Sequence, residues 1–211
     1  FMLSRVGVTG VRKPVQIRRP DKVVTLVITT DVFVDLPASL KGSHMSRNLQ
    51  AFNEVVEESS RNPATGLEEL CLTMTGALLE KHEYAGRAEA LMRADYFLPR
   101  TSASGITSTE PFGLMARAVM SRDGASRVSI GVEVRGMNAC PCAMETVRAL
   151  LVREEPDIAR LEQKGIPCIT HNQRNITTLE VETSGDERVE ADTLVEIAEE
   201  GQSAATLEIL K

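Results

Sequence analysis

The chain has 211 residues, of which 42% are apolar and 26% charged, a composition that suits one or two globular domains with a substantial core. A net charge of −6 and the absence of tryptophan argue against a general nucleic-acid-binding surface. No apolar run approaches the ~18 residues needed to cross a bilayer, and no secretory signal pattern opens the chain. We therefore expect a cytoplasmic protein without a membrane or nucleic-acid partner.

Apolar periodicity in the first half predicts the order strand, strand, helix, helix, strand, strand. The four strands are expected at residues 5–18, 23–36, 87–98 and 112–120. One helix is expected from Met45, and a second follows the capping-box pattern of Thr65 and Glu68. Cys71 lies on the apolar stripe of this second helix, so we interpret it as a core residue. Residues 100–110 are expected to form a polar loop.

The second half repeats part of this order and then stops. Strands are expected at residues 127–135 and 175–183, and helices at 143–152, 156–165 and 190–200. A slip in the alternation of the last strand is expected at Thr177 and Thr178. At least one strand is missing relative to the first half, so the chain looks incomplete beyond Lys211. The pattern suggests one architecture used twice, in modules at residues 1–121 and 122–211.

Three cysteines and a histidine lie close together in the sequence and are candidates for a metal site. They are Cys140, Cys142, Cys168 and His171. Thiolate and imidazole suit borderline-soft metals such as Zn(II) and Fe(II). The Cys-Pro-Cys spacing is too tight for the usual Cys-x2-Cys knuckle of structural zinc sites, so one of these two cysteines is expected to miss the metal. Buried inert thiols and a redox or nucleophilic cysteine are the alternatives.

Short motifs along the chain carry a resemblance to a known family. They are RVGVTGVRK at 5–13, VDLP at 34–37, KGSHMSR at 41–47, HEYA at 82–85, RAE at 87–89, ACPCA at 139–143 and THNQR at 170–174. In this order they resemble the type IB GTP cyclohydrolases, and most closely the archaeal Fe(II)-dependent branch. The resemblance implies an α+β tunnelling fold, with two tandem ββααββ-like modules whose antiparallel sheets assemble into an oligomeric barrel.

The same resemblance implies a metal-dependent enzyme that opens the imidazole ring of GTP and releases formate. The product implied by the archaeal branch is 7,8-dihydroneopterin 2′,3′-cyclic phosphate, for methanopterin biosynthesis. The alternatives are the bacterial-type product, 7,8-dihydroneopterin triphosphate, and a non-catalytic protein with a structural Cys/His zinc site. The expected cofactor is Fe(II), although Zn(II) or Mn(II) would also suit the ligands. The expected assembly is a homo-oligomer, either a dimer or a tetramer.

Matched position by position, the resemblance makes Cys140 and His171 the catalytic residues and metal ligands. Cys142 then becomes a neighbour of the metal, and Cys168 is incidental. The acidic metal ligand and the glutamate that anchors the purine in this family are expected beyond Lys211.

Basic side chains near a helix start are the candidates for binding the substrate. The expected substrate-binding residues are Lys41, His44, Arg47 and Arg174. Cations and backbone amides at a loop-to-helix junction can hold phosphate, although a solvated loop capped by Ser43 or Ser46 is the alternative for the first three. His82 follows Lys81 at a helix C-terminus, where a cation would complement the helix dipole, and we interpret it as structural.

Overall fold

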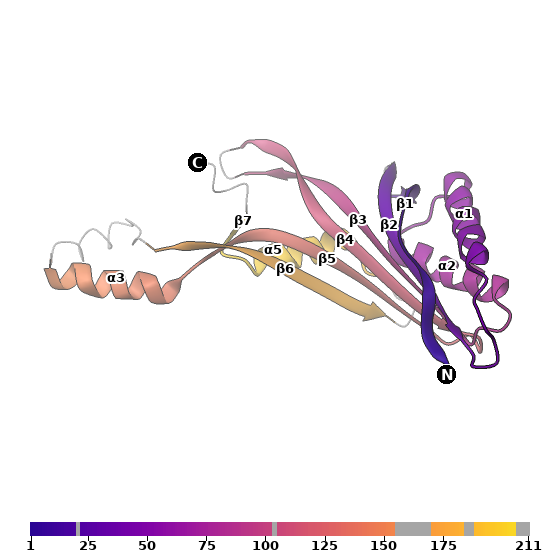
Figure 1. Ribbon diagram of the computed structural model, residues 1–211. Coiled ribbons are helices and arrows are strands. Elements are labelled where there is room, and N and C mark those ends of the chain that lie inside the picture. The colour runs from indigo at the N-terminus through magenta and orange to yellow at the C-terminus, as the bar shows by residue number, and fades with distance from the viewer. Residues whose placement is uncertain (20–21, 103–104, 155–169, 184–187, 206–211) are drawn as a thin grey trace.

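The computed structural model describes residues 1–19, 22–102, 105–154, 170–183 and 188–205 (Figure 1). Its described strands form one antiparallel sheet in the order β1-β2-β3-β4-β5-β6, with the short β7 also paired to β5. The strands are β1 (Leu3–Arg18), β2 (Val23–Leu36), β3 (Arg87–Thr101), β4 (Thr107–Ser121), β5 (Ser126–Ala139), β6 (Asn172–Thr183) and β7 (Ala204–Ala205). The helices are α1 (Met45–Arg61), α2 (Leu67–Lys81), α3 (Pro141–Glu154) and α5 (Ala191–Glu200).

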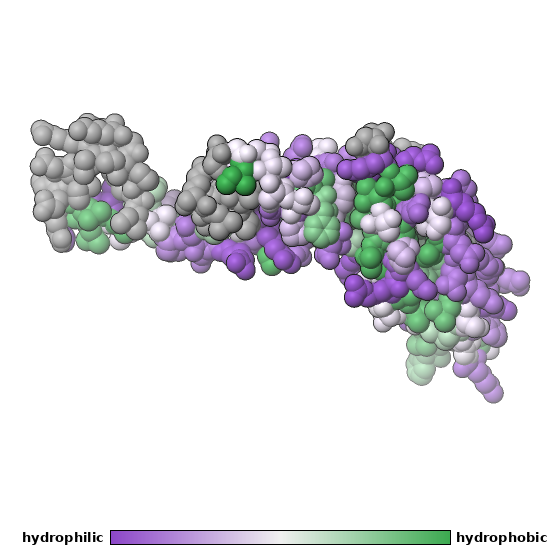
Figure 2. All heavy atoms as spheres, turned by 90° about the horizontal axis from the view of Figure 1, so that it is seen from above, coloured by the Kyte–Doolittle hydropathy of each residue, from purple (hydrophilic) through white to green (hydrophobic). Residues whose placement is uncertain are grey.

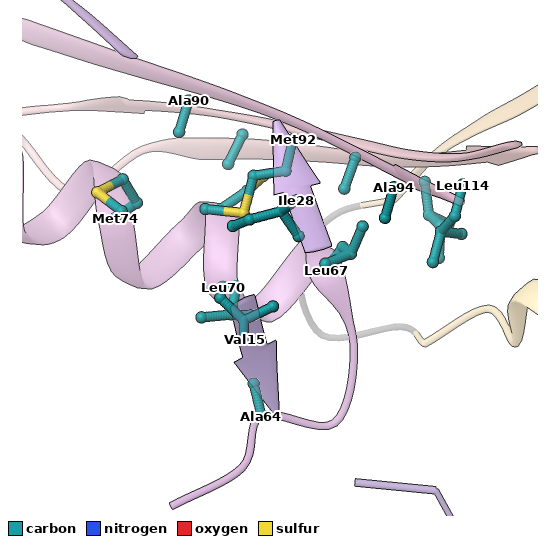
Figure 3. Close-up of a cluster of buried hydrophobic side chains, with 14 of the residues drawn as sticks. Val15, Ile28, Ala64, Leu67, Leu70, Met74, Ala90, Met92, Ala94 and Leu114 are labelled. Atoms are coloured by element: carbon teal, nitrogen blue, oxygen red, sulfur yellow. The ribbon is translucent and has the colours of Figure 1, made fainter. Parts of the chain in front are cut away.

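Side-chain alternation along the strands gives the sheet one covered face and one open face. In β3 the even-numbered Ala90, Met92 and Ala94 are buried, whereas the odd-numbered Arg87 and Arg93 are exposed. The even-numbered side chains meet α1, α2 and α5, which all contribute to a single hydrophobic cluster. Figure 3 shows part of this cluster, with side chains of α2 packed against those of β2 and β3. The sheet is therefore covered by helices on one face only, within the described residues.

The antiparallel α+β architecture predicted from the sequence is confirmed, and so is the element order of the first half. Cys71 is fully buried in the core as expected, and burial raises the pKa of its thiol. The module boundary between residues 121 and 122 falls in the turn from β4 to β5, and hydrogen bonds join these two strands across it. The division into two tandem modules stays a prediction.

The loop predicted at residues 100–110 is wrong, because β3 extends to Thr101 and β4 begins at Thr107. Two contacts explain the longer hairpin. The hydroxyl groups of Thr101 and Thr107 lie 2.9 Å apart across the strands. Arg100 forms an ion pair with Glu199 of α5, with an N–O distance of 3.0 Å. Polar side chains that look like a loop in the sequence are thus held by α5, far away along the chain.

The capping box predicted at Thr65 and Glu68 is also wrong. The α2 helix begins after Gly66, and the backbone amide and hydroxyl of Thr65 both donate to the carboxylate of Glu69. Glu68 instead turns inward, where burial raises the pKa of its carboxyl group. Glu69 rather than Glu68 therefore accepts the hydrogen bonds of Thr65, because Glu68 packs inward. The local motif does not distinguish between these two neighbouring glutamates.

The second half of the chain contributes β5, β6 and α5 to the same sheet and core. Alternation in β6 stays regular through Thr177 and Thr178, so the expected slip is wrong. The helix predicted at residues 156–165 lies outside the described residues, as does Cys168.

Figures 1 and 2 both show an elongated molecule in which α3 projects beyond the sheet, at the end away from α1 and α2. Hydrophilic residues, purple in Figure 2, cover much of the end that carries α1. Among the described helices, none combines the length and apolar character that a membrane crossing requires.

Candidate functional site

Cys140 and His171 lie opposite each other where the β5–β6 ladder ends. The last paired residues of the ladder are Ala139 and Asn172, and the amide of Cys140 donates to the carbonyl of His171 at 3.3 Å. The hydroxyl of Thr170 donates to the carbonyl of Cys140 at 2.7 Å, which ties the two chain segments together again. Directly opposed residues of an antiparallel pair place their Cβ atoms about 5 Å apart. The fold therefore brings together two residues that are 31 positions apart in the sequence.

Cys140 also begins a helix. Pro141 is the first residue of α3, a position that suits proline because its missing amide hydrogen would have no helical partner. The sulfur of Cys140 accepts the amide of Ala143 at 3.4 Å, and its carbonyl accepts the amide of Met144 at 3.1 Å. Cys140 is thereby fixed at the N-terminus of α3 through both its sulfur and its carbonyl.

The Cys-Pro-Cys motif thus separates its two cysteines by structural role. Cys140 is half-buried at the end of the ladder, whereas Cys142 is exposed in the first turn of α3. The carbonyl of Cys142 accepts the hydroxyl of Thr146, as in the interior of a helix. The expectation that one of the two cysteines does not reach the metal stays a prediction.

The donors at this end of the sheet suit a metal in their chemistry. Thiolate sulfur and imidazole nitrogen are ligands that Fe(II) and Zn(II) accept. The described residues contain no cluster of three or more histidine, cysteine, aspartate or glutamate side chains arranged to hold a metal. A metal held by Cys140 and His171 would need at least one further ligand from outside the described ranges or from another chain. Arg174, on β6 opposite Met137, is exposed near this end.

The other predicted substrate-binding residues lie where β2 leads into α1. We call Lys41, His44 and Arg47 the basic junction. Lys41 is exposed, and His44 precedes α1 without capping it through its side chain. Arg47 is half-buried and donates to the carbonyl of Lys81 at the end of α2, at 3.0 Å. The cap by Ser43 or Ser46 is not formed, because the described start of α1 has no side-chain cap and Ser43 bonds elsewhere.

A chain of four polar side chains underlies this junction. His82 is completely buried, with Nε2 2.8 Å from Oδ1 of Asn48 and Nδ1 2.9 Å from the hydroxyl of Tyr84. The hydroxyl of Tyr84 lies 3.0 Å from that of Ser43. Because the amide oxygen of Asn48 can only accept, Nε2 of His82 carries the proton and Nδ1 accepts from Tyr84. Each side chain in the series therefore donates a hydrogen bond to the next, from Ser43 to Tyr84, from Tyr84 to His82 and from His82 to Asn48.

His82 is structural, as expected, but it is not a cation at the helix end. Burial lowers the pKa of its imidazole, and the positive charges of Arg47 and His44 lower it further. Besides Arg47, the cation that binds carbonyls at the end of α2 is Arg122, from the turn after β4. Its guanidinium donates to the carbonyls of Leu79, His82 and Ala85 at 2.6 to 2.8 Å. The last carbonyls of the helix are thereby satisfied by a side chain from another element.

The basic junction and the Cys140–His171 pair lie at opposite ends of the sheet (Figure 1). The loop after β2 leaves the sheet beside the start of β3, since Val34 pairs with Ala88. The strand β4 ends at this same end and turns into β5, which runs away from it over 14 residues. At about 3.3 Å per residue, β5 spans roughly 40 Å before it reaches Cys140. A single chain does not bring the two groups together.

Sequence reasoning assigned no role to three side chains that shape this region. They are Asn48, Tyr84 and Arg122. Tyr84 lies within the HEYA motif, but the motif alone does not indicate that its hydroxyl links Ser43 to His82. Asn48 and Arg122 had no local signal, because their partners lie 34 and 40 residues away in the sequence.

Comparison with known proteins gives consistent results along the whole chain. The family model described as type I GTP cyclohydrolase folE2 matches residues 1–211. Proteins named GTP cyclohydrolase MptA are similar over 99% of this chain. One from Methanoregula boonei is 41% identical and one from Methanococcoides burtonii 40% identical, and the chain covers 68% and 70% of their lengths. GTP cyclohydrolase MptA 1 from Methanocella arvoryzae is 37% identical, with 69% of its length covered.

Among solved structures, uricase from Arthrobacter globiformis aligns with a TM-score of 0.48 and 11% sequence identity, over 90% of this chain and 96% of that one.

Proposed function

Because this chain belongs to the type I GTP cyclohydrolase FolE2 family, we propose that it is the GTP cyclohydrolase of methanopterin biosynthesis. The reaction opens the imidazole ring of GTP, releases C8 as formate and closes a pterin ring. The proposed product is 7,8-dihydroneopterin 2′,3′-cyclic phosphate. The observation that carries the proposal is the juxtaposition of Cys140 and His171 at the end of the β5–β6 ladder, in a chain of this family.

In this proposal Cys140 and His171 hold the metal, which we propose to be Fe(II). A divalent cation bound there supplies Lewis acidity, which makes water nucleophilic near neutral pH. The protein contributes orientation. The hydrogen bond from the Cys140 amide to the His171 carbonyl fixes the two backbones, and the amide of Ala143 holds the sulfur. Thiolate is the form of cysteine that binds metal, and the N-terminus of α3 places a backbone amide beside the Cys140 sulfur.

The basic junction is proposed to bind the triphosphate of GTP, and Arg174 to contact phosphate nearer the metal. Guanidinium and ammonium groups are well suited to phosphate oxygens. The hydrogen-bonded side chains of Ser43, Tyr84, His82 and Asn48 hold the junction in place. Ser43 lies in the loop before α1, and Asn48 lies on α1. Orientation of the phosphates would then depend on a scaffold that is anchored by the buried side chains of His82 and Asn48.

A site that needs both ends of the sheet needs two chains. We therefore propose a homo-oligomer in which Cys140 of one subunit meets the basic junction of another. Support comes from the sheet edges. Within the described residues β1 and β6 each pair with one strand only, so each offers an unpaired edge to another copy. Such pairing would also close the open sheets into the barrel that the family resemblance implies.

The activity is tested by incubating the purified protein with GTP and Fe(II) without oxygen. Release of formate, together with the mass of the cyclic phosphate, is the expected result. If the product is instead 7,8-dihydroneopterin triphosphate, the chain is still a GTP cyclohydrolase but the proposed product is wrong. No formate with Fe(II), Mn(II) or Zn(II) would overturn the enzyme itself. Cys168→Ser is the matched control, because a closed four-ligand zinc site requires Cys168 whereas the proposed site does not.

The shared site is tested by complementation between two inactive variants. Cys140→Ser and Arg47→Gln remove opposite halves of the proposed site. When the two variants are co-expressed, mixed oligomers should contain some sites with both halves intact, and activity should return. If the mixture stays as inactive as each variant alone, while native mass measurement shows mixed oligomers, the two halves do not belong to one site between chains.

A further inference from the structure

The open face of the sheet contains an arginine-rich pocket near the β4–β5 turn. Its cavity measures about 500 Å³, within the range of small-molecule sites. The residues that matter most are Arg87, Arg117, Arg127, Ser121 and Ser126, which come from β3, β4 and β5. Strand pairing puts Arg87, Arg117, Ser121 and Arg127 on the face opposite the helices, so these side chains are separate from the buried core.

The arginine pocket is positive in a protein whose net charge is −6. Three guanidinium groups line it, and the one carboxylate among its lining residues is Glu182. The ion pair of Glu182 with Arg127 is loose, at 3.9 Å, and both side chains are more than half exposed. A pair of this kind contributes little, so a stronger anion can displace it at small cost.

Arg87 has a guanidinium that is uncommitted. Its backbone amide donates to Oδ1 of Asp35 at 2.8 Å, which fixes the start of β3. Its side chain makes no hydrogen bond or ion pair with any residue that the structure describes, although it lines the cavity. Five guanidinium donors facing a concave site are therefore available to a ligand.

Arg117 is held in place by its neighbours. Its Nε and one terminal nitrogen lie 2.9 Å from Oε1 of Glu89, a carboxylate whose other oxygen pairs with Arg5 at 3.0 Å. The side chain of Glu89 is only 5% exposed. Arg117 therefore enters the pocket from a fixed position, with its remaining donors free to bind.

We propose that the arginine pocket binds the phosphoryl group of a phosphorylated small molecule, with Arg87 and Arg127 as its main ligands. Guanidinium groups pair with phosphate oxygens through two parallel hydrogen bonds, and the hydroxyl of Ser121, which pairs with Arg87 across the strands, adds a donor. The cavity is larger than one phosphate ion needs, so a diphosphate or a nucleotide fits its volume better. The proposal does not depend on the catalytic assignment of Cys140 or of the basic junction.

Pyrophosphate is the probe, and its binding to the full chain is measured by titration calorimetry at fixed ionic strength. Wild-type protein should bind it saturably, and Arg87→Gln and Arg127→Gln should each weaken binding by about tenfold or more. Arg93→Gln is the matched control, because it removes the same charge from the same face outside the pocket. It should change the affinity by less than about twofold. Equal losses in all three variants would mean general charge attraction and overturn the proposal.

The substrate site could also bind pyrophosphate, and Arg47→Gln separates the two. Binding to the arginine pocket should survive in Arg47→Gln and disappear in the Arg87→Gln, Arg127→Gln double variant. The reverse pattern, or no saturable binding to the wild-type chain, would overturn the proposal. Parallel titrations with GTP and guanosine distinguish the source of the phosphate. A nucleotide site responds to GTP with the same arginine dependence, and guanosine alone should not bind there.

Discussion

The imidazole of His82 is fixed by the side-chain amide of Asn48, with 2.8 Å between Nε2 and Oδ1, in a region that water does not reach. The contact joins the end of α2 to the first turn of α1, and through Tyr84 it extends to the loop before α1. A fully buried polar contact thus lies beside the basic junction.

His82→Ala should lower the free energy of unfolding by about 2–4 kcal/mol, because it leaves a cavity and strands buried groups of Asn48 and Tyr84. Urea denaturation at pH 7 measures the change. His44→Ala is the control, since His44 is a histidine of the same region that is exposed. It should cost no more than about 0.5 kcal/mol. Equal costs in the two variants would contradict the assignment of His82 as a buried hydrogen-bonded residue.

Stability should fall as the pH drops below the ordinary imidazole pKa of about 6.5. The folded protein lowers the pKa of His82, mainly by burial, so in this range the unfolded chain takes up a proton more readily than the folded one. The contribution of His82 is fully present above that pH and is lost between the unfolded and folded pKa values. Urea midpoints from pH 7.5 to 5 should decline less steeply in His82→Gln. An identical decline would assign the pH dependence to other groups.

Cys140→Ser should reduce formate release by at least about a hundredfold and lower the content of bound metal, while the fold survives. A hydroxyl is a far weaker ligand for soft or borderline metals than a thiolate. Cys142→Ser is the matched control, two positions away but exposed in α3, and should keep most of the activity. Metal analysis and circular dichroism accompany the rate measurements. Substantial activity in Cys140→Ser would remove Cys140 from the metal site.

Glu89→Gln should destabilise the protein by about 1–2 kcal/mol, because it removes the buried charge that Arg5 and Arg117 share. The loss is moderate since both arginines are half-exposed and can be hydrated again. Glu182→Gln removes a similar carboxylate–arginine pair from the same face at an exposed position. Its effect should be at most about 0.5 kcal/mol. The comparison of the two unfolding curves isolates the effect of burial.

Gly76→Ala should stabilise the protein by about 1 kcal/mol. Gly76 lies in the interior of α2, where alanine is the better helix former, and a Cβ atom there would meet no described atom within 4 Å. Gly7→Ala is the opposite case, because its Cβ would overlap the carbonyl of Val32 on the neighbouring strand. That change should cost about 1–3 kcal/mol. Thermal unfolding of both variants tests whether glycine is required at one position and merely tolerated at the other.

Local periodicity predicted the elements well wherever one face of a strand or helix is buried by regular packing. The even-numbered residues of β3 and the apolar stripe of α2 are examples, and Cys71 followed from that stripe. The failures occurred where distant residues decide the local conformation. Arg100 extends β3 because Glu199 of α5 holds it, and no window around residue 100 contains that information.

The candidate site divides in the same way. Cys140 and His171 could be chosen by residue type and motif, and the register of β5 with β6 then placed them together. The motif order could not show that the basic junction lies at the other end of the sheet. That separation follows from strand directions and lengths, which emerge only when the whole sheet is assembled.

The helix α3 has a consequence for how metal and structure depend on each other. No described side chain of α3 is buried, and a helix of its 14 residues is marginally stable alone. Its first turn is nevertheless fixed to the sheet through the sulfur and carbonyl of Cys140. A metal that immobilises the sulfur would therefore favour the helical state, and a neighbour that grips α3 would raise the affinity for metal by the same factor. Binding of a second chain and binding of the metal would then be thermodynamically coupled, so that each would strengthen the other.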